Sequence, residues 1–395
     1  MTVIIALVSC GSPEETKPTQ QVAPSLSRGQ GQPFGPADAI VDCNGGGDFT
    51  TISAAIAAAT AGDVIEVWPC TYQERINFGG RDLWIKSRDG SATTIIDAEN
   101  QGTAVTVESG EGDMTGLVGF TLRRASTQAV HVDLSAIHLR DIAIRDSDAS
   151  YGILSASADL ELDQVSIDAS NDFSVAGVYA DRGSLVVHAS DIDCAGANIG
   201  VFSGHGACLI DWSELTCTNG GSYAFDNEHT VGRLMRTILR GDFFMLSEDD
   251  KPDDGMFVLG NIIDGDVDVE YGTIDLVNNV IQGQLNLTLA TLPAIHNNVF
   301  LGQACYISTD TLETYPTNNN FFNGDSSCGY VDYVGADGNI AEEPGFVNPM
   351  AFDFTLAADS PMIDAGLNDP FWADVDGSRA DIGAYGSRYS IGGGW

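Results

Sequence analysis

A repeat of about 22 residues is the feature that most limits the fold of this 395-residue chain. From residue 119 onward, a polar residue recurs before two or three apolar residues and a turn. The apolar residue after the polar one serves as an anchor at positions 120, 142, 165, 192, 215, 238, 262, 280, 299 and 321. One such unit cannot bury its own apolar side chains, so the period predicts a solenoid in which neighbouring coils stack.

The residues between the anchors favour strands over helices. Apolar residues alternate before the anchors, as in Ile137 and Leu139 and again in Leu160 and Leu162. Leucine-rich repeats share the period but need a fixed leucine lattice and a helical return, and a propeller needs a longer unit. We therefore predict an all-β chain: a parallel β-helix of about 11 to 12 coils.

Asparagine replaces the other polar residues before the anchor in the late coils, and a glycine follows it. Asparagine tolerates the left-handed backbone region and can pair amide to amide with the next coil. We predict a structural asparagine ladder formed by Asn261, Asn279, Asn298 and Asn320, with turns at Gly265, Gly283, Gly302 and Gly324.

The ends of a solenoid expose unpaired strand edges and must be covered. Residues 46–62 predict a short helix with a threonine cap, and Ile52, Ala55, Ile56 and Ala59 on its apolar face would plug the first coil. Residues 346–395 predict the cap of the other end. The β-helix with both caps would form one domain, residues 39–395.

Two stretches resemble known β-helix proteins. The opening, residues 46–72, resembles that of the right-handed parallel β-helix proteins of the pectin-lyase-like superfamily, which include pectin methylesterases. The motifs at residues 360–366, 374–379 and 381–385 resemble the closing segment of bacterial secreted β-helix proteins of the choice-of-anchor type. The resemblance spans about residues 40–386 and implies a right-handed parallel β-helix, but a fold does not transfer an activity.

The resemblance also bears on the cysteines. Where such openings carry Pro-Gly-Thr-Tyr, this chain has Cys70 in place of the glycine, and Cys43 precedes the helix. This departure suggests a Cys43–Cys70 disulfide that ties the cap to the first coil. Cys305 and Cys328 flank a late coil and suggest a second one.

The other cysteines are expected inside the coil. Cys194 and Cys217 would face inward in adjacent coils, about 4.8 Å apart with parallel Cβ directions, which suits a disulfide poorly. A buried pair of thiols is favoured over a disulfide there. Cys208 is interpreted as a core residue.

The first 38 residues differ in composition from the rest. Residues 1–10 end in Leu-Val-Ser-Cys and resemble the apolar region and lipobox of a bacterial lipoprotein, although the basic residues that open a signal peptide are missing. The alternative is a buried first strand. Residues 11–38 have the composition of a flexible tether. We interpret residues 1–10 as a truncated signal segment with lipidation at Cys10, and expect a protein of the cell envelope, lipid-anchored to the outer membrane or cell surface, or secreted.

Charge excludes one class of partner. The chain has 17 Lys and Arg against 56 Asp and Glu, a formal net charge of −39. Binding to nucleic acid requires a basic surface, so no nucleic-acid partner is expected, and membrane contact would run through the lipid anchor alone.

Two catalytic patterns of β-helix enzymes are incomplete. A polysaccharide lyase needs a base beside a charge stabiliser, often with Ca²⁺, and the candidates are Arg123, Arg124, Arg140 and Arg145. A polygalacturonase-like hydrolase carries Gly-His-Gly, which matches residues 204–206 around His205, but the acidic pair expected one coil upstream is missing. The motifs of pectin methylesterases are not recognisable.

Acidic residues offer weak candidates for a cation site. The loop at residues 248–254 contains Glu248, Asp249, Asp253 and Asp254 as candidate ligands, but it lacks the spacing of a calcium loop and is favoured as a solvated loop. Asp374, Asp376 and Asp381 are a second set, for which a turn-forming role is favoured. No cofactor is expected unless these acids bind Ca²⁺.

The sequence favours a non-catalytic role. We predict a cell-surface module that binds carbohydrate or matrix, or that serves as a structural element, with a polysaccharide or surface glycan as partner. The alternative is a polysaccharide lyase or glycoside hydrolase that acts on an acidic polysaccharide. Aromatic residues outside the ladder would stack on sugars, whereas Trp212 is interpreted as a core residue.

Overall fold

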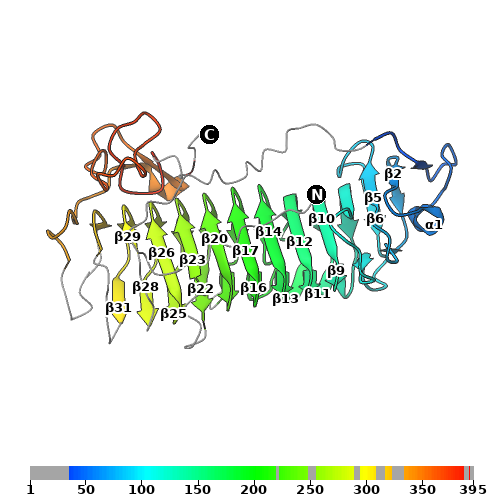
Figure 1. Cartoon of the computed structure of the whole chain (residues 1–395), viewed down its shortest axis with the longest axis horizontal. Helices are drawn as coiled ribbons and strands as arrows, with labels where there is room; N and C mark the ends of the chain where they lie inside the picture. The colour runs from blue at the N-terminus through cyan, green and yellow to red at the C-terminus, as the bar shows by residue number, and fades with distance from the viewer. Residues whose placement is uncertain are drawn as a thin grey trace.

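The computed structural model describes residues 35–218, 222–247, 255–288, 294–307, 316–322, 333–386 and 391. These residues form a parallel β-helix, a long rod whose coils stack along one axis (Figure 1). The strands belong to a 21-stranded sheet, called sheet A, and an 11-stranded sheet, called sheet B. Each turn contributes one strand to sheet B, so the rod has 11 turns, as the repeat predicted. None of the helices in the described residues is long and apolar enough to span a membrane.

Sheet B comprises β4 (Ile76–Asn77), β7 (Val105–Val107), β9 (Gln128–Asp133), β11 (Asp148–Ala156), β13 (Asp172–Asp181), β16 (Ile199–Gly204), β19 (Tyr223–Glu228), β22 (Asp242–Leu246), β25 (Val267–Glu270), β28 (Leu285–Thr288) and β31 (Ala304–Ile307). The strands alternate inward and outward side chains. One inward column consists of Val130, Ile153, Val178, Val201, Phe225, Phe243, Val267 and Leu285, all fully buried.

Sheet A comprises β1 (Ala39–Val41), β2 (Val64–Val67), β3 (Cys70–Tyr72), β5 (Trp84–Ser87), β6 (Thr94–Asp97), β8 (Gly116–Arg123), β10 (Ala136–Arg145), β12 (Asp159–Ile167), β14 (Ser184–His188), β15 (Asp191–Asp193), β17 (Ala207–Asp211), β18 (Glu214–Thr216), β20 (Val231–Met235), β21 (Ile238–Arg240), β23 (Gly255–Leu259), β24 (Ile262–Asp264), β26 (Thr273–Val277), β27 (Val280–Ile281), β29 (Ile295–His296), β30 (Val299–Phe300) and β32 (Asn320–Phe321). It bends once per turn at a residue with positive φ, such as Asp141, Gln164 or Asn278. The bend divides sheet A into two faces, so each coil has three sides.

The helix predicted at the N-terminal end is α1 (Ile52–Ala58). Thr51 caps it by accepting a hydrogen bond from the Ala54 backbone N–H, and the Glu74 carboxylate accepts two more from the first turn. Ile52, Ala55 and Ile56 are buried in the core of the first coil, as predicted.

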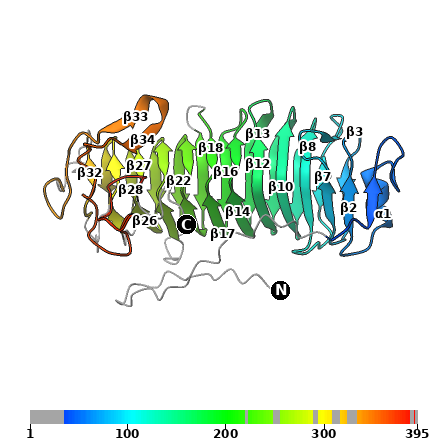
Figure 2. The same cartoon turned by 90° about the horizontal axis from the view of Figure 1, so that it is seen from above.

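The described part of the C-terminal segment, residues 346–386, lies along the side of the rod rather than over its end, contrary to the prediction. Its hairpin of β33 (Phe346–Asn348) and β34 (Asp353–Leu356), with the short 3₁₀-helix Pro349–Ala351 between them, lies along the side of the rod with the residues that follow (Figure 2). Phe354, Met362, Ile382 and Ala384 pack on outward residues of three late strands of sheet A: Ile262, Val280 and Val299. The segment is therefore a lateral cover.

This lateral cover explains an error in the predicted register. A regular repeat would place anchors 262, 280 and 299 inside, but the residues that follow them, such as Ile263 and Ile281, align with Leu239 and face the core. Anchors 192 and 215 are also displaced, because Ile192 pairs with Ile167 rather than with Val165. In the late strands β24, β27 and β30 both faces are apolar, so their sequence does not distinguish inside from outside.

The asparagine ladder is present with one correction. Asn261 donates to the side chain of Asn279 at 3.0 Å, Asn279 to that of Asn298 at 2.9 Å, and Asn298 to that of Asn319 at 3.0 Å. Asn319, rather than Asn320, is therefore the next member, because Asn320 pairs with Val299 and lies one position further along. Asn339 extends the ladder at 3.3 Å. Glycines stack beside it: a Cβ on Gly283 would lie 2.2 Å from the Gly265 carbonyl oxygen.

Two disulfides are present among the described residues. Cys43 and Cys70 join the N-terminal cap to the first coil, as the resemblance implied. Cys194 and Cys217 also form a disulfide, contrary to the prediction of buried thiols. They lie just past β15 and β18, where the chain turns, and their Cα atoms are 5.2 Å apart, so the parallel Cβ geometry of a regular ladder does not apply.

The remaining cysteine predictions have mixed outcomes. Cys208 is a buried free thiol, as expected of a core residue, and burial raises its pKa to about 12. Cys328 lies outside the described residues, so a Cys305–Cys328 disulfide stays a prediction.

Candidate functional site

The outer face of sheet B carries most of the features that point to a ligand. We define the sheet-B face as the outward side chains of β11, β13, β16, β19, β22 and β25. Its central column aligns Leu154, Tyr179, Phe202, Asp226, Phe244 and Asp268 from successive coils. A second outward column aligns Ala156, Asp181, Gly204, Glu228, Leu246 and Glu270.

Aromatic rings group on this face. The Tyr179 and Phe202 rings stack with centroids 4.2 Å apart, and Tyr151 meets the Tyr179 ring edge to face at 5.4 Å. Further along, the Tyr223 and Phe244 rings are 5.3 Å apart. Because residues in register repeat every coil, the rings form a row parallel to the axis of the rod. Phe225, two residues after Tyr223, instead lies in the core.

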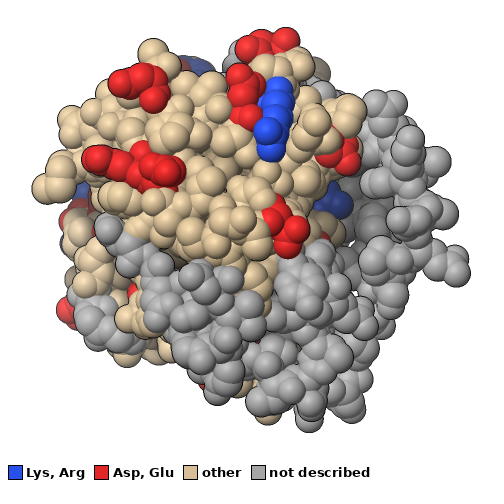
Figure 3. Space-filling view, turned by 90° about the vertical axis from the view of Figure 1, so that its left-hand side faces the viewer, with Lys and Arg blue, Asp and Glu red and all other residues tan. Residues whose placement is uncertain are grey.

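Charge on sheet B has a single sign. Its 11 strands contain no lysine or arginine, although they contain nine carboxylates: Asp133, Asp148, Asp172, Asp181, Asp226, Glu228, Asp242, Asp268 and Glu270. The end of the rod that carries β31 also shows more acidic than basic groups (Figure 3). Such a surface attracts cations and repels anions.

Asp226 is the most unusual residue of the face. It lies between Phe202 and Phe244 in the central column and is only 6% exposed, although its strand neighbours place it on the outside. Its Oδ1 has no hydrogen-bond partner. Burial, and after it the charge of Glu228, raises the pKa of Asp226 to about 7. The carboxyl group therefore holds a proton near neutral pH unless a cation stabilises its charge.

A row of residues with positive φ marks the corner where the chain leaves sheet B: Leu134, Ser157, Arg182, His205, His229 and Tyr271. Nδ1 of His205 lies 2.9 Å from Oδ1 of Asp181, and Nε of Arg182 lies 3.0 Å from Oδ2 of the same carboxylate. The His205 and His229 rings are 4.9 Å apart. His205, a candidate from the sequence, is thus an exposed imidazole that Asp181 orients and that lies beside the guanidinium of Arg182.

The Gly-His-Gly tripeptide has a structural cause. A Cβ on Gly206 would lie 1.9 Å from the Gly183 carbonyl oxygen of the preceding coil, and one on Gly204 would lie 2.7 Å from the Phe202 ring. Both glycines are required by close approach. The tripeptide therefore carries no evidence of catalysis by itself.

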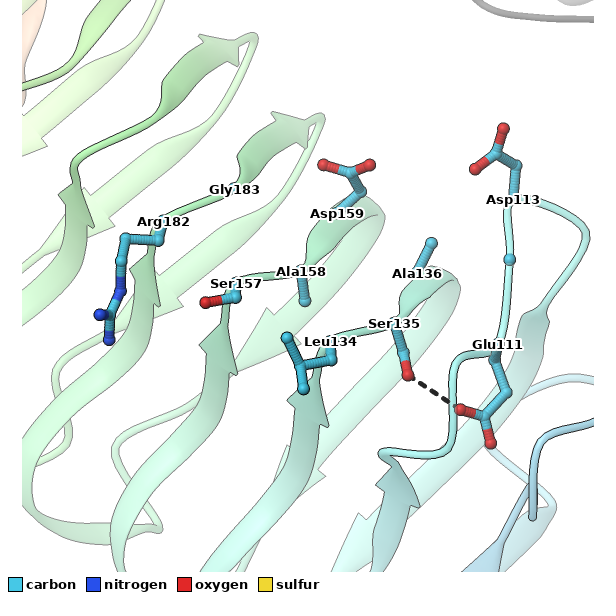
Figure 4. Close-up of a pocket in the computed structure, with 11 residues that line it drawn as sticks. Glu111, Asp113, Leu134, Ser135, Ala136, Ser157, Ala158, Asp159, Arg182 and Gly183 are labelled. Atoms are coloured by element: carbon cyan, nitrogen blue, oxygen red, sulfur yellow. Dashed lines mark hydrogen bonds between the residues drawn. The ribbon is translucent and has the colours of Figure 1, made fainter.

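A shallow groove of about 420 Å³ follows this corner toward the N-terminus (Figure 4). Leu134, Ser157 and Arg182 line it from the corner row, and Asp113 and Asp159 line its other side. Glu111 closes one end and accepts a hydrogen bond from Ser135 at 2.9 Å. Although burial opposes it, hydrogen bonds from Gly80, Ser109 and Ser135 lower the pKa of Glu111, so this acid has a structural role.

The four predicted arginines do not join His205. Arg123 and Arg124 both bind Asp97, a fully buried carboxylate, with Nε–O distances of 2.8 and 2.6 Å. Arg140 pairs with Asp163 at 3.2 Å, and Arg145 pairs with Asp168 at 3.5 Å. All four belong to the coils of sheet A or the turn after β8. They serve ion pairs between coils instead of a common site.

Trp212 was interpreted as a core residue, and this is wrong. It occupies the bend of sheet A with φ of 54° and is 36% exposed. Its ring covers the guanidinium of Arg236, whose carbon lies 4.8 Å from the ring centroid. Arg236 in turn binds the buried carboxylate of Asp211.

One group of acids converges among the described residues. Carboxylate oxygens of Asp364, Asp374 and Asp381 lie within 4.8 Å of one another in the C-terminal segment. Asp376, named with them from the sequence, instead accepts hydrogen bonds from Ser378 in a turn. Burial and the neighbouring carboxylate raise the pKa of Asp374. Ca²⁺ stays a prediction for this group, testable by thermal unfolding with added Ca²⁺; the acidic loop at residues 248–254 lies outside the described residues.

Sequence reasoning missed Asp226 and the aromatic row. The stretch Tyr-Ala-Phe-Asp-Asn-Glu at residues 223–228 contains the signal, because an acid follows the apolar Phe225 at an alternate position of the strand. Its partners Phe202 and Phe244 come from other coils, so only the register brings them together.

Comparisons with known proteins give the following. No protein-family model matches the chain, and no curated protein matches it. Among solved structures, it is similar to the pectate lyase Pel9A, with 15% identity, 85% of this chain and 90% of that chain covered, and a TM-score of 0.44. It is also similar to a pectin methylesterase from carrot, with 14% identity, 83% and 100% covered, and a TM-score of 0.31. A pectin methylesterase from Aspergillus niger shares 11% identity over 76% of this chain and 93% of its own, with a TM-score of 0.25.

Proposed function

We propose that the protein is a cell-surface β-helix that binds a polysaccharide along the sheet-B face without cleaving it. The observation that carries the proposal is the row of aromatic rings on that face, from Tyr151 through Tyr179 and Phe202 to Tyr223 and Phe244. Rings with an apolar body and, in tyrosine, a polar tip are suited to sugars, which have apolar faces and many hydroxyl groups. A row parallel to the rod suits an extended polymer.

The proposal is tested by changing one ring of the row. Tyr179→Ala removes the ring that contacts both Tyr151 and Phe202, and we expect it to weaken binding to an immobilised glycan array about tenfold, or 1.4 kcal/mol. Phe371→Ala is the matched control, because Phe371 is an aromatic residue of the C-terminal segment with 45% exposure. Equal binding by both variants and the parent protein would contradict the proposal, provided that circular dichroism shows them folded.

The cellular location is part of the same proposal. Disulfides persist in oxidising compartments, and the Cys43–Cys70 and Cys194–Cys217 bonds support a site outside the cytoplasm. We propose a lipid anchor at Cys10, which lies outside the described residues. Labelling of the protein in cells with radioactive palmitate should be lost in Cys10→Ser, and labelling that persists would exclude the anchor.

One observation favours an alternative, cleavage of an acidic polysaccharide by a lyase reaction. His205 is oriented by Asp181, and Arg182 stands beside the same carboxylate at the end of the groove. A base next to a cation is the minimum that proton abstraction beside a sugar carboxylate requires. Absorbance of an unsaturated product from polygalacturonate, lost in His205→Ala, would establish this alternative. No product with the parent protein would exclude it for that substrate.

A further inference from the structure

The sheet-B face carries acids and would favour a cationic ligand. The acids near Asp226 come from four strands. Glu228 follows it on β19 at the next outward position, about 6.6 Å along the strand. Asp181 lies two coils before Glu228 in the same column, and Asp268 lies two coils after Asp226. Asp242 begins β22 in register with Tyr223. The nearest basic residue in the described chain that borders this face, Arg182, is bound to Asp181.

The side chains that flank Asp226 are aromatic. Phe202 and Phe244 stand on either side in the central column, and the Tyr223 ring lies 5.3 Å from that of Phe244. A carboxylate between ring faces and edges resembles the arrangement that binds organic ammonium groups, in which the negative ring faces and the acid both attract the cation. A compact inorganic cation would need several converging oxygens, and Asp226 belongs to no such group among the described residues.

Asp226 itself indicates that a partner is missing. The residue is 94% buried, and its Oδ1 accepts no hydrogen bond. An unpaired acid at such a position lowers stability, since a buried polar group without a partner loses its hydrogen bonds to water and gains none in return. A cationic ligand that approaches this carboxylate from the outer side of sheet B would stabilise its charge.

We propose that the sheet-B face binds an amino-sugar polymer, with an ammonium group of the sugar facing Asp226 between Phe202 and Phe244. The inference rests on the proposed function and names its ligand class. A uronic-acid polymer would meet carboxylates of its own sign along the face. A neutral polymer would leave the charge of the face uncompensated.

Binding of an ammonium group has a measurable consequence. Without ligand, Asp226 holds a proton near neutral pH because burial and Glu228 raise its pKa. The titratable groups that interact electrostatically with it are Glu228, Tyr179 and Tyr223. None of these groups is a cation in the described structure, so an arriving ammonium group lowers the pKa of Asp226. Binding therefore releases protons.

Isothermal titration calorimetry near pH 6, in two buffers of different ionisation heat, tests the inference. The probes are hexamers of glucosamine, N-acetylglucosamine and galacturonate. We expect the glucosamine hexamer to bind at least about tenfold more tightly than the other two and to release protons. Asp226→Asn should abolish the proton release and weaken binding about tenfold. Glu228→Gln should weaken binding as well, whereas Glu99→Gln, the same change at an exposed residue outside sheet B, should not.

The outcomes distinguish failure of the ammonium inference from failure of the proposed polysaccharide binding. If the acetylated or the uronate hexamer binds as tightly as glucosamine, and Tyr179→Ala removes that binding, the ammonium inference is overturned while the proposed function stands. If no hexamer binds, both fail. A lysine hexapeptide is a further probe, and binding as tight as that of the glucosamine hexamer would overturn the inference in favour of a general charge effect. Thermal midpoints show whether each variant is folded.

Discussion

The faces of sheet A and sheet B are built from the same repeat but treat charge in opposite ways. On the coils of sheet A, cations stand beside acids: Arg123 and Arg124 with Asp97, Arg140 with Asp163, Arg145 with Asp168, Arg240 with Glu214, and Lys86 with Glu66. On sheet B no strand carries a cation, and Asp226 is buried without a partner. Sheet A pairs these arginines and this lysine with acids, although Asp275 of β26 is also buried with an unpartnered Oδ1. The strands of sheet B carry acids without any lysine or arginine, and a cationic ligand can use this charge.

The difference in ion pairing between the two sheets indicates which face of a solenoid can bind a charged ligand. Parallel neighbours repeat every 4.8 Å or so, which brings like charges together unless the sequence alternates them. The ion pairs of sheet A resolve this repulsion. The acids of sheet B have no such ion pairs on their strands, so their repulsion lowers the stability of the fold, as is common at binding sites.

The largest expected effect is on the sheet-A side of the comparison. Asp97→Asn removes the fully buried carboxylate that holds Arg123 and Arg124, so the two guanidinium groups lose their partner. We expect a loss of about 3 kcal/mol in the free energy of unfolding, because the charge-assisted hydrogen bonds from both guanidinium groups are lost, while these groups, 34% and 38% exposed, stay partly solvated. Urea unfolding followed by fluorescence measures it, and a change near zero would show that sheet A does not depend on this pair.

The same substitution at Asp226 should have the opposite sign. The folded pKa of about 7 lies above the ordinary 3.8, so the folded state binds more protons than the unfolded state between these values. The contribution of Asp226 to stability is therefore present at low pH and is lost as pH rises through 7, by about 3 kcal/mol. The Asp226→Asn variant does not lose this stability as pH rises, because asparagine does not titrate.

Thermal unfolding of the parent protein and Asp226→Asn on both sides of that window is the measurement. The two midpoints should agree near pH 4 and diverge near pH 8, with the variant more stable. A constant difference at all pH values would mean that Asp226 does not titrate in this range.

Salt should affect the two regions differently. Screening weakens the repulsion among Asp181, Glu228, Asp242 and Asp268, so we expect added NaCl to stabilise the parent protein by about 1 kcal/mol. The gain should shrink in Glu228→Gln and stay unchanged in Glu99→Gln. Midpoints from differential scanning calorimetry at low and high NaCl test this, and a net destabilisation by salt would show that the ion pairs of sheet A dominate.

The smallest effect is expected for the exposed pairs of sheet A. The side chains of Arg140 and Arg145 are 43% and 53% exposed, so each pair contributes about 0.5 kcal/mol or less. Arg140→Gln and Arg145→Gln should leave both stability and glycan binding nearly unchanged. Loss of glycan binding in either variant, measured on the array used for Tyr179→Ala, would move the candidate site from sheet B to sheet A.

Elements with a clear local sequence signal were predicted correctly, whereas features that depend on the register between coils were not. The helix over Ile52–Ala58 has a cap, an apolar face and an unambiguous place, and it was predicted correctly. The asparagine ladder was correct at Asn261, Asn279 and Asn298, which are 18 and 19 residues apart, and wrong by one residue at Asn320, because the next step to Asn319 is 21 residues. A shift of one residue reverses the direction of every side chain in a strand, so small irregularities in coil length suffice for such an error.

The candidate site was less predictable for the same reason. His205 could be singled out because its tripeptide is local, but its partner Asp181 lies 24 residues away and became evident only from the register. The arginines were grouped by their proximity in sequence, although they bind three different acids: Asp97, Asp163 and Asp168. The Cys194–Cys217 disulfide was missed because the prediction assumed regular strand geometry at a turn.

The sequence by itself determined the coil, its period, its N-terminal helix and its polar ladder, because each of these follows from local propensities repeated many times. Only the tertiary structure decided that Ile262, Val280 and Val299 point outward rather than into the core. Their strands are apolar on both faces, because the outer face packs against the C-terminal segment. The tertiary structure also decided that Asp226 lies between two aromatic rings without a partner. Such pairings join residues from different coils, and their alignment depends on the cumulative register of the whole rod rather than on any one stretch of sequence.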